Sequence, residues 1–179
     1  MTDTQVTRTY ADPDTDADAA VTAARDALRD TYALTGLATV HTYMDLYDHV
    51  DNPTDIDRGV ALVAETAWSR GHVEPTRTQT AFTGAVREVM HAATADHHDA
   101  VDILHRALIY ARTTERPAPV DGLDDKAFAG AMADLLAASA HHIPGWCALT
   151  TACAALAQFT AEAEPRPLTI PQQHGDSPS

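Results

Sequence analysis

The sequence predicts an all-α protein: a single-domain bundle of about six or seven helices with disordered termini. Alanine, the strongest helix former, is abundant along the chain. Apolar residues recur at helical spacing through most of it, and turn residues separate the periodic segments. With 179 residues, of which 45% are hydrophobic and 21% charged, the chain suits one folded domain with a sizeable core.

The domain organisation follows from where the helical pattern begins and ends. Residues 1–13 are polar and acidic without an apolar period, which predicts a disordered N-terminus and no signal peptide. Residues 14–163 form the helical domain, and the proline-rich residues 164–179 form a disordered tail. The uncharged stretch 143–161 consists mainly of Ala and Thr, so we interpret it as a buried helix and not as a membrane span.

Two helices are expected at the start of the domain. The first covers about residues 14–34, with Val21 and Leu28 on its apolar face. The second covers about residues 37–50, and Gly36 between them either breaks the helix or bends it.

A further helix is expected over about residues 55–70. Thr54 or Asp55 precedes it as an N-cap, because short polar side chains accept hydrogen bonds from the first free N–H groups. Gly71 is suited to end this helix, since glycine accepts the left-handed conformation common after a last turn.

The second half of the domain is predicted from long periodic segments. The pattern over residues 76–113 fits one long helix or two helices that meet near residues 95–96. Two more helices are expected over about 124–142 and 145–163. Both are dense in alanine, which lets helix axes approach closely, so we expect them to form the tight centre of the bundle or a dimer seam.

Composition limits the classes of function. The net charge is −14, from 26 acidic residues against 12 Lys and Arg, which disfavours binding to phosphate backbones and hence to nucleic acid. The chain contains no nucleophile-elbow motif and no glycine-rich phosphate loop, which argues against an enzyme. Cys147 and Cys153 suggest small core residues in a reducing, cytoplasmic environment, and Trp68 and Trp146 are expected in the core.

Ten histidines call for a functional explanation. His98, Asp102 and His105 have i, i+4, i+7 spacing, which puts them on one helix face. Two imidazoles and a carboxylate are able to hold Zn or non-haem Fe together with a ligand from elsewhere. Helical projection places these three, with Glu88 and His91, opposite the main apolar face, which favours a solvent-exposed stripe.

Other histidines give different expectations. A second polar stripe comprises His41, Asp45, Asp48 and His49, and it is either an exposed face or one wall of a polar cleft. His97 projects with the apolar residues of its segment, so we expect it to be buried. A ligand pocket near His97, Tyr43 and Tyr47 is a further hypothesis.

Our leading interpretation is a non-enzymatic, acidic, helical interaction or regulatory protein that self-associates or binds a protein partner in the cytoplasm. It requires no cofactor, no nucleic acid and no membrane. One alternative is a metal-binding bundle, or metalloenzyme, with Zn or Fe at His98, Asp102 and His105. The other alternative is a bundle that binds a small molecule.

Overall fold

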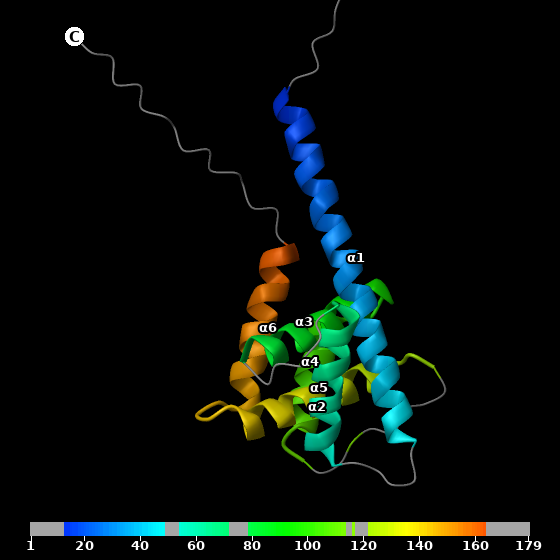
Figure 1. Ribbon diagram of the computed structural model, residues 1–179, viewed down its shortest axis with the longest axis vertical. Helices are drawn as coiled ribbons and strands as arrows, with labels where there is room; N and C mark the ends of the chain where they lie inside the picture. Colours follow the sequence, from blue (N-terminus) through cyan, green and yellow to red (C-terminus); the bar gives the residue numbers. More distant parts are fainter. Residues whose placement is uncertain (1–12, 49–53, 72–78, 114–115, 117–121, 164–179) are drawn as a thin grey trace, which may run out of the picture.

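The expected all-α bundle is confirmed. In a computed structural model, the described residues 13–48, 54–71, 79–113, 116 and 122–163 contain helices and no strand (Figure 1). The helices are α1 (Pro13–Tyr47), α2 (Asp55–Ser69), α3 (Gln79–Ala95), α4 (Ala100–Tyr110), α5 (Asp125–His142) and α6 (Ala148–Ala163). The segments predicted to be disordered lie outside the described residues, except for Pro13, which begins α1.

The two helices expected at the start of the domain are one helix of 35 residues. Gly36 neither breaks nor ends it. A Cβ atom at Gly36 would lie 2.0 Å from the carbonyl oxygen of Glu88 on α3. The glycine therefore permits the close crossing of α1 and α3, and the break, one of the two alternatives for Gly36, does not occur.

The periodic segment 76–113 contains two helices, the second of the two arrangements allowed by its sequence. α3 ends at Ala95, and His97 adopts a left-handed φ of 66° in the turn that follows. Asp99 then begins α4 as its N-cap, because its side chain accepts hydrogen bonds from the N–H groups of Val101 and Asp102 at 3.0 and 3.1 Å.

The predicted cap of α2 is also present. Thr54 Oγ1 accepts a hydrogen bond from the Asp57 N–H at 3.2 Å. Gly71, with a φ of 78°, follows the last turn of this helix as expected.

The centre of the bundle is formed by α3 and α5, each of which contacts all five other helices. Figure 1 shows both lying across the more upright α1, α2 and α6. The alanine-rich α5 is buried along most of its length, which confirms the tight centre expected for this helix. By contrast, α6 is peripheral, so the expectation of a buried helix over residues 143–161 was wrong. The buried residues of α6 are Thr151, Ala152 and Ala155.

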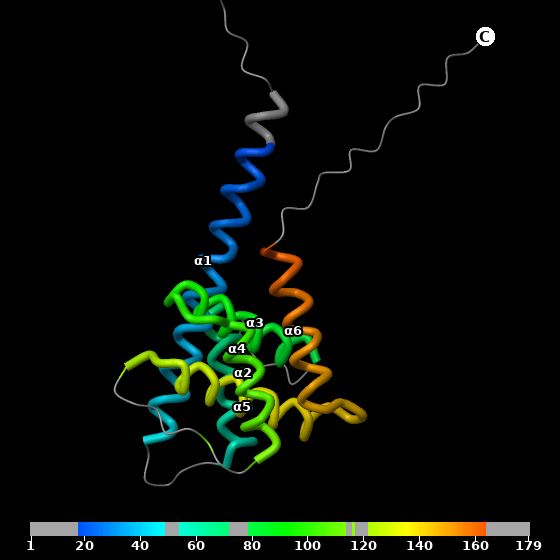
Figure 2. Tube along the Cα trace, turned by 180° about the vertical axis from the view of Figure 1, so that it is seen from behind, coloured from blue at the N-terminus to red at the C-terminus, as the bar shows by residue number. Residues whose placement is uncertain are grey.

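The first helix projects from the body of the bundle. Its N-terminal part extends past the other helices on the side where α6 ends (Figures 1 and 2). Most residues from 18 to 31 are exposed. Among the described residues, no helix combines the length and the apolar character needed to cross a membrane.

Three residues expected in the core are at the surface. Trp68 is exposed because the buried face of α2 carries Leu62 and Thr66, and residue 68 lies on the opposite side. Cys147, in the turn before α6, and Cys153, on its outer face, are free and exposed. Trp146 is half-buried.

Candidate functional site

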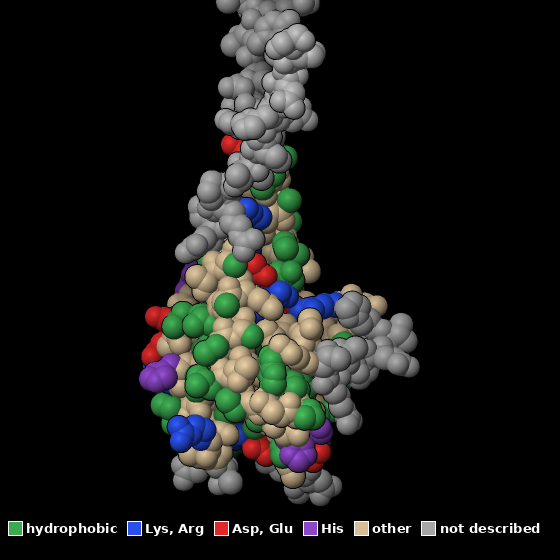
Figure 3. Space-filling view, turned by 90° about the vertical axis from the view of Figure 1, so that its left-hand side faces the viewer, with side chains coloured by type: hydrophobic (Ala, Val, Ile, Leu, Met, Phe, Trp, Pro, Cys, Tyr) green, Lys and Arg blue, Asp and Glu red, His purple; other side chains and the backbone are tan. Residues whose placement is uncertain are grey.

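The candidate site is a cleft between the projecting half of α1 and the C-terminal half of α6, with a volume of about 350 Å³. Arg25, Leu28, Arg29 and Tyr32 line it from α1, and Gln158, Ala161 and Glu162 line it from α6. Arg29 bridges the two helices, since its Nε donates a hydrogen bond to the Glu162 carbonyl oxygen at 3.1 Å. Figure 3 shows side chains of both charges where the projecting helix joins the body.

A chain of alternating charges extends inward from this cleft. Glu162 Oε1 accepts a hydrogen bond from Arg87 Nη1 at 3.1 Å, and Arg87 Nη2 lies 3.1 Å from Glu88 Oε1. Arg70, at the end of α2, also pairs with Glu88, which is fully buried. Two arginines thus neutralise a carboxylate that is removed from water. This series of alternating charges joins α2, α3 and α6.

His91 completes the cluster on the side of α6. Its Nε2 lies 2.7 Å from Glu162 Oε2, and its ring packs between Tyr32 and Phe159, with centroid distances of 5.5 and 4.8 Å. Burial lowers the pKa of His91, and the carboxylate of Glu162 opposes this shift only in part. The neutral ring, in the tautomer with a proton on Nε2, therefore donates a hydrogen bond to Glu162.

Arg87 also connects the cluster to α1. Its guanidinium lies 4.1 Å from the ring centroid of Tyr32, a cation–π contact. Among the described residues, Arg87 Nε and Glu88 Oε2 are buried without a hydrogen-bond partner. Such groups are costly to bury, and this cost offsets part of the stabilisation that the ion pairs contribute.

The prediction that Glu88 and His91 face solvent was wrong. Projection onto one helix assumes a single buried face, whereas α3 is surrounded by the other five helices. Its polar side meets α1, α2 and α6. The E-x-x-H spacing of these two residues on one face, beside Arg87, was the available sequence signal.

Two of the three residues predicted to bind metal, His98 and Asp102, pair with other side chains. His98 Nδ1 lies 2.6 Å from Asp125 Oδ1, and Asp102 Oδ2 lies 2.5 Å from Arg106 Nη2. His105 is exposed on α4. Within the described part of the chain, no group of three or more His, Cys, Asp or Glu side chains is arranged to hold a metal ion.

The remaining histidine predictions have mixed outcomes. His97 is exposed, so its predicted burial was wrong: the projection assumed a helix through residue 97, where the chain turns. An exposed His97 cannot line an enclosed pocket with Tyr43, which is fully buried. In the second stripe, His41, Asp45 and Asp48 are exposed, whereas His49 lies outside the described residues.

A second buried ion cluster, not anticipated from the sequence, lies between α2 and α5. Asp134 on α5 is fully buried, and its oxygens lie 2.6 Å from Arg58 Nε and 2.7 Å from Arg116 Nε. Arg116 also pairs with Asp55 at 2.8 Å. Burial raises the pKa of Asp134, while the two arginines oppose that effect. The cluster joins α2 and α5 to the segment that precedes α5.

Both clusters consist of buried ion pairs that join helices. His91 contacts the Glu162 carboxylate and the rings of Tyr32 and Phe159. Comparison with family models, with curated proteins and with solved structures gave no significant match to the chain. The fold and the cleft define an all-α bundle with one projecting helix.

Proposed function

We propose that the protein is a non-enzymatic helical interaction protein that self-associates through the projecting half of α1. The observation that carries the proposal is the exposure of this half, including Leu28, which is 46% exposed. An isolated helix shorter than about 15 residues is marginally stable in water, so a projecting end gains stability from a partner helix.

A second copy of the same chain fits this surface. The cleft beside Leu28 can take side chains of a helix that lies along α1 and α6. Ala24 and Val21 continue the apolar face toward the N-terminus. The helix has an acidic start and carries Arg25 and Arg29 farther along. Antiparallel pairing of two copies brings these opposite charges together, whereas parallel pairing aligns like charges.

The cytoplasm suits this proposal. Both cysteines, Cys147 and Cys153, are free and exposed, and exposed free thiols persist in a reducing compartment. The net charge of −14 keeps such a protein soluble and limits non-specific association, so pairing depends on the specific face of α1.

Sedimentation velocity of the full chain over a concentration series tests the proposal. We expect a reversible dimer that the Leu28→Glu variant dissociates, because the new charge would be buried between two helices. Val101→Glu is the matched control, since Val101 is 50% exposed on α4 and away from this face. A strict monomer at every concentration, or equal effects of the two variants, would overturn the proposal.

A further inference from the structure

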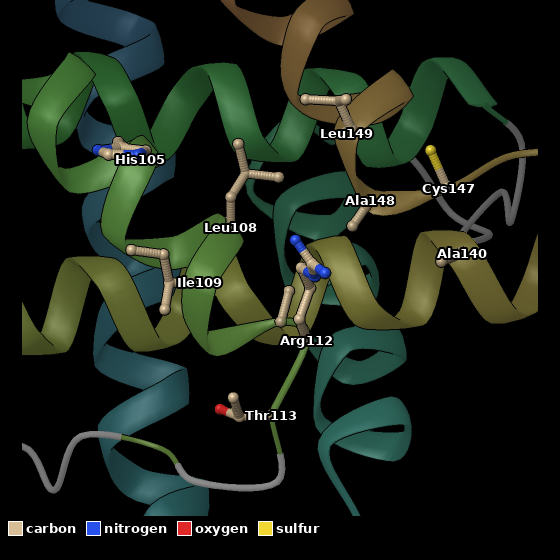
Figure 4. A pocket seen from close by; sticks show the side chains of 10 residues that line it. His105, Leu108, Ile109, Arg112, Thr113, Ala140, Cys147, Ala148 and Leu149 are labelled. Atoms are coloured by element: carbon tan, nitrogen blue, oxygen red, sulfur yellow. The ribbon is translucent and has the colours of Figure 1, made fainter.

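A second cleft, lined mainly by apolar side chains, lies among α4, α5 and α6 (Figure 4). Its walls include Leu108 and Ile109 from α4, Ala140 from α5 and Leu149 from α6. Ile109 is 55% and Leu149 is 57% exposed. The cavity volume of about 830 Å³ falls in the range of small-molecule sites, which are mostly apolar with a few polar groups.

One cation extends into this apolar cleft. Arg112 follows the last turn of α4, and Figure 4 shows its side chain reaching between Leu108 and Ala148. Its guanidinium has no hydrogen-bond or ion-pair partner among the described residues. Arg112 is exposed at the edge of the apolar walls. In a chain with more than twice as many acidic as basic residues, such an arginine provides charge complementarity for an anion.

The α6 end of the cleft also favours negative charge. Cys147 lies just before α6, with its Sγ 3.3 Å from Thr150 Oγ1. The hydrogen bond with the Thr150 side chain, together with backbone N–H groups at the start of α6, lowers the pKa of the Cys147 thiol. The first residues of this helix, Ala148 and Leu149, are part of the cleft wall.

We propose that this cleft binds an amphipathic anion, a small molecule with an apolar body and one carboxylate, sulfonate or phosphate group. The apolar body lies against Ile109 and Leu149, and the anionic group pairs with Arg112. This binding site is separate from the α1 surface. The proposal of anion binding is therefore independent of the proposal of self-association.

Isothermal titration calorimetry of the full chain with decanoate, and with decan-1-ol as its neutral counterpart, tests the proposal. We expect Arg112→Gln to weaken decanoate binding about tenfold and to leave decanol binding unchanged. Lys126→Gln is the matched control, because it removes one exposed positive charge at the far end of α5. Leu149→Ala should weaken the binding of both probes, since it removes apolar wall without changing charge.

Two further experiments distinguish a small anion from other possible occupants of the cleft. Co-sedimentation with phosphatidylglycerol vesicles distinguishes a membrane lipid surface from a free ligand, and sedimentation velocity of Leu149→Ala detects a second copy. The proposal is supported if decanoate binds and only the Arg112 variant loses the preference for the charged probe. It is overturned if decanoate does not bind at up to about 1 mM, if Arg112→Gln and Lys126→Gln behave alike, if only vesicles bind, or if Leu149→Ala dissociates an oligomer.

Discussion

His91 Nε2 and Glu162 Oε2 lie 2.7 Å apart, and this contact fastens the outer end of α6 to the central helix α3. Glu162 also accepts hydrogen bonds from Arg87 through its other oxygen and from Arg29 through its carbonyl. One residue near the end of α6 thus connects this helix to both α1 and α3.

We predict that stability falls below about pH 6.5 because of His91. Burial lowers the pKa of His91 in the folded protein below its ordinary value. The unfolded chain therefore binds a proton first as the pH decreases. The stabilisation is fully present above the unfolded pKa and is lost as pH falls through the folded pKa, with a slope of at most about 1.4 kcal/mol per pH unit.

Urea unfolding between pH 7.5 and 5.0 measures this effect. The His91→Gln variant keeps a hydrogen-bond donor toward Glu162 but does not titrate, so its stability should depend less on pH than that of the wild type. Carboxylates elsewhere titrate equally in both proteins, and the difference between the two curves isolates His91. Parallel curves for the two proteins would show that His91 does not change its pKa on folding.

The positions of the helices were predictable because their signals are local. Thr54 caps α2 and Gly71 follows its last turn, and both were identified from residue type and position alone. Gly36 shows the limit of the same reasoning. A glycine within a helical pattern indicates a break or a close approach equally well, and only the position of α3 distinguishes the two.

The candidate site was less predictable because it is formed between helices. Glu162 on α6 lies 71 residues from His91 and 75 residues from Arg87, and Tyr32 on α1 lies 55 residues from Arg87. No helical period relates these residues. The predicted burial of His97 was wrong for a different reason. The projection assigned it to the apolar face of a continuous helix, but the chain turns at Asp96–Asp99 before α4 begins.

We predict that Gly36→Ala destabilises the protein by about 2 kcal/mol or more, although alanine is the better helix former. The added Cβ would lie 2.0 Å from the Glu88 carbonyl oxygen, so α1 and α3 must move apart. Gly84→Ala is the control in α3, where the nearest atom is Arg70 Nη2 at 3.1 Å, the end of a flexible side chain. Its stability should stay within about 1 kcal/mol of the wild type.

Thermal and urea unfolding of both glycine variants provide the comparison. A stabilised Gly36→Ala would mean that the two helices are not in close contact at this residue. If Gly84→Ala lost stability and Gly36→Ala did not, the close crossing of α1 and α3 at Gly36 would also be contradicted. Circular dichroism should show that both variants remain helical, because neither substitution removes a hydrogen bond of the backbone.

We predict that Ala24→Cys, in a background with Cys147→Ser and Cys153→Ser, forms a disulfide between two copies of the chain under mild oxidation. Ala24 is exposed and lies between Val21 and Leu28 on the apolar face of the projecting helix. In an antiparallel pair with two-fold symmetry, a residue near the axis faces its own counterpart. Thr22→Cys is the control, because residue 22 lies about 200° around the helix from residue 24.

Non-reducing electrophoresis should show a dimer band for Ala24→Cys and little for Thr22→Cys. Equal cross-linking of the two variants would indicate random collision and would exclude pairing through this face.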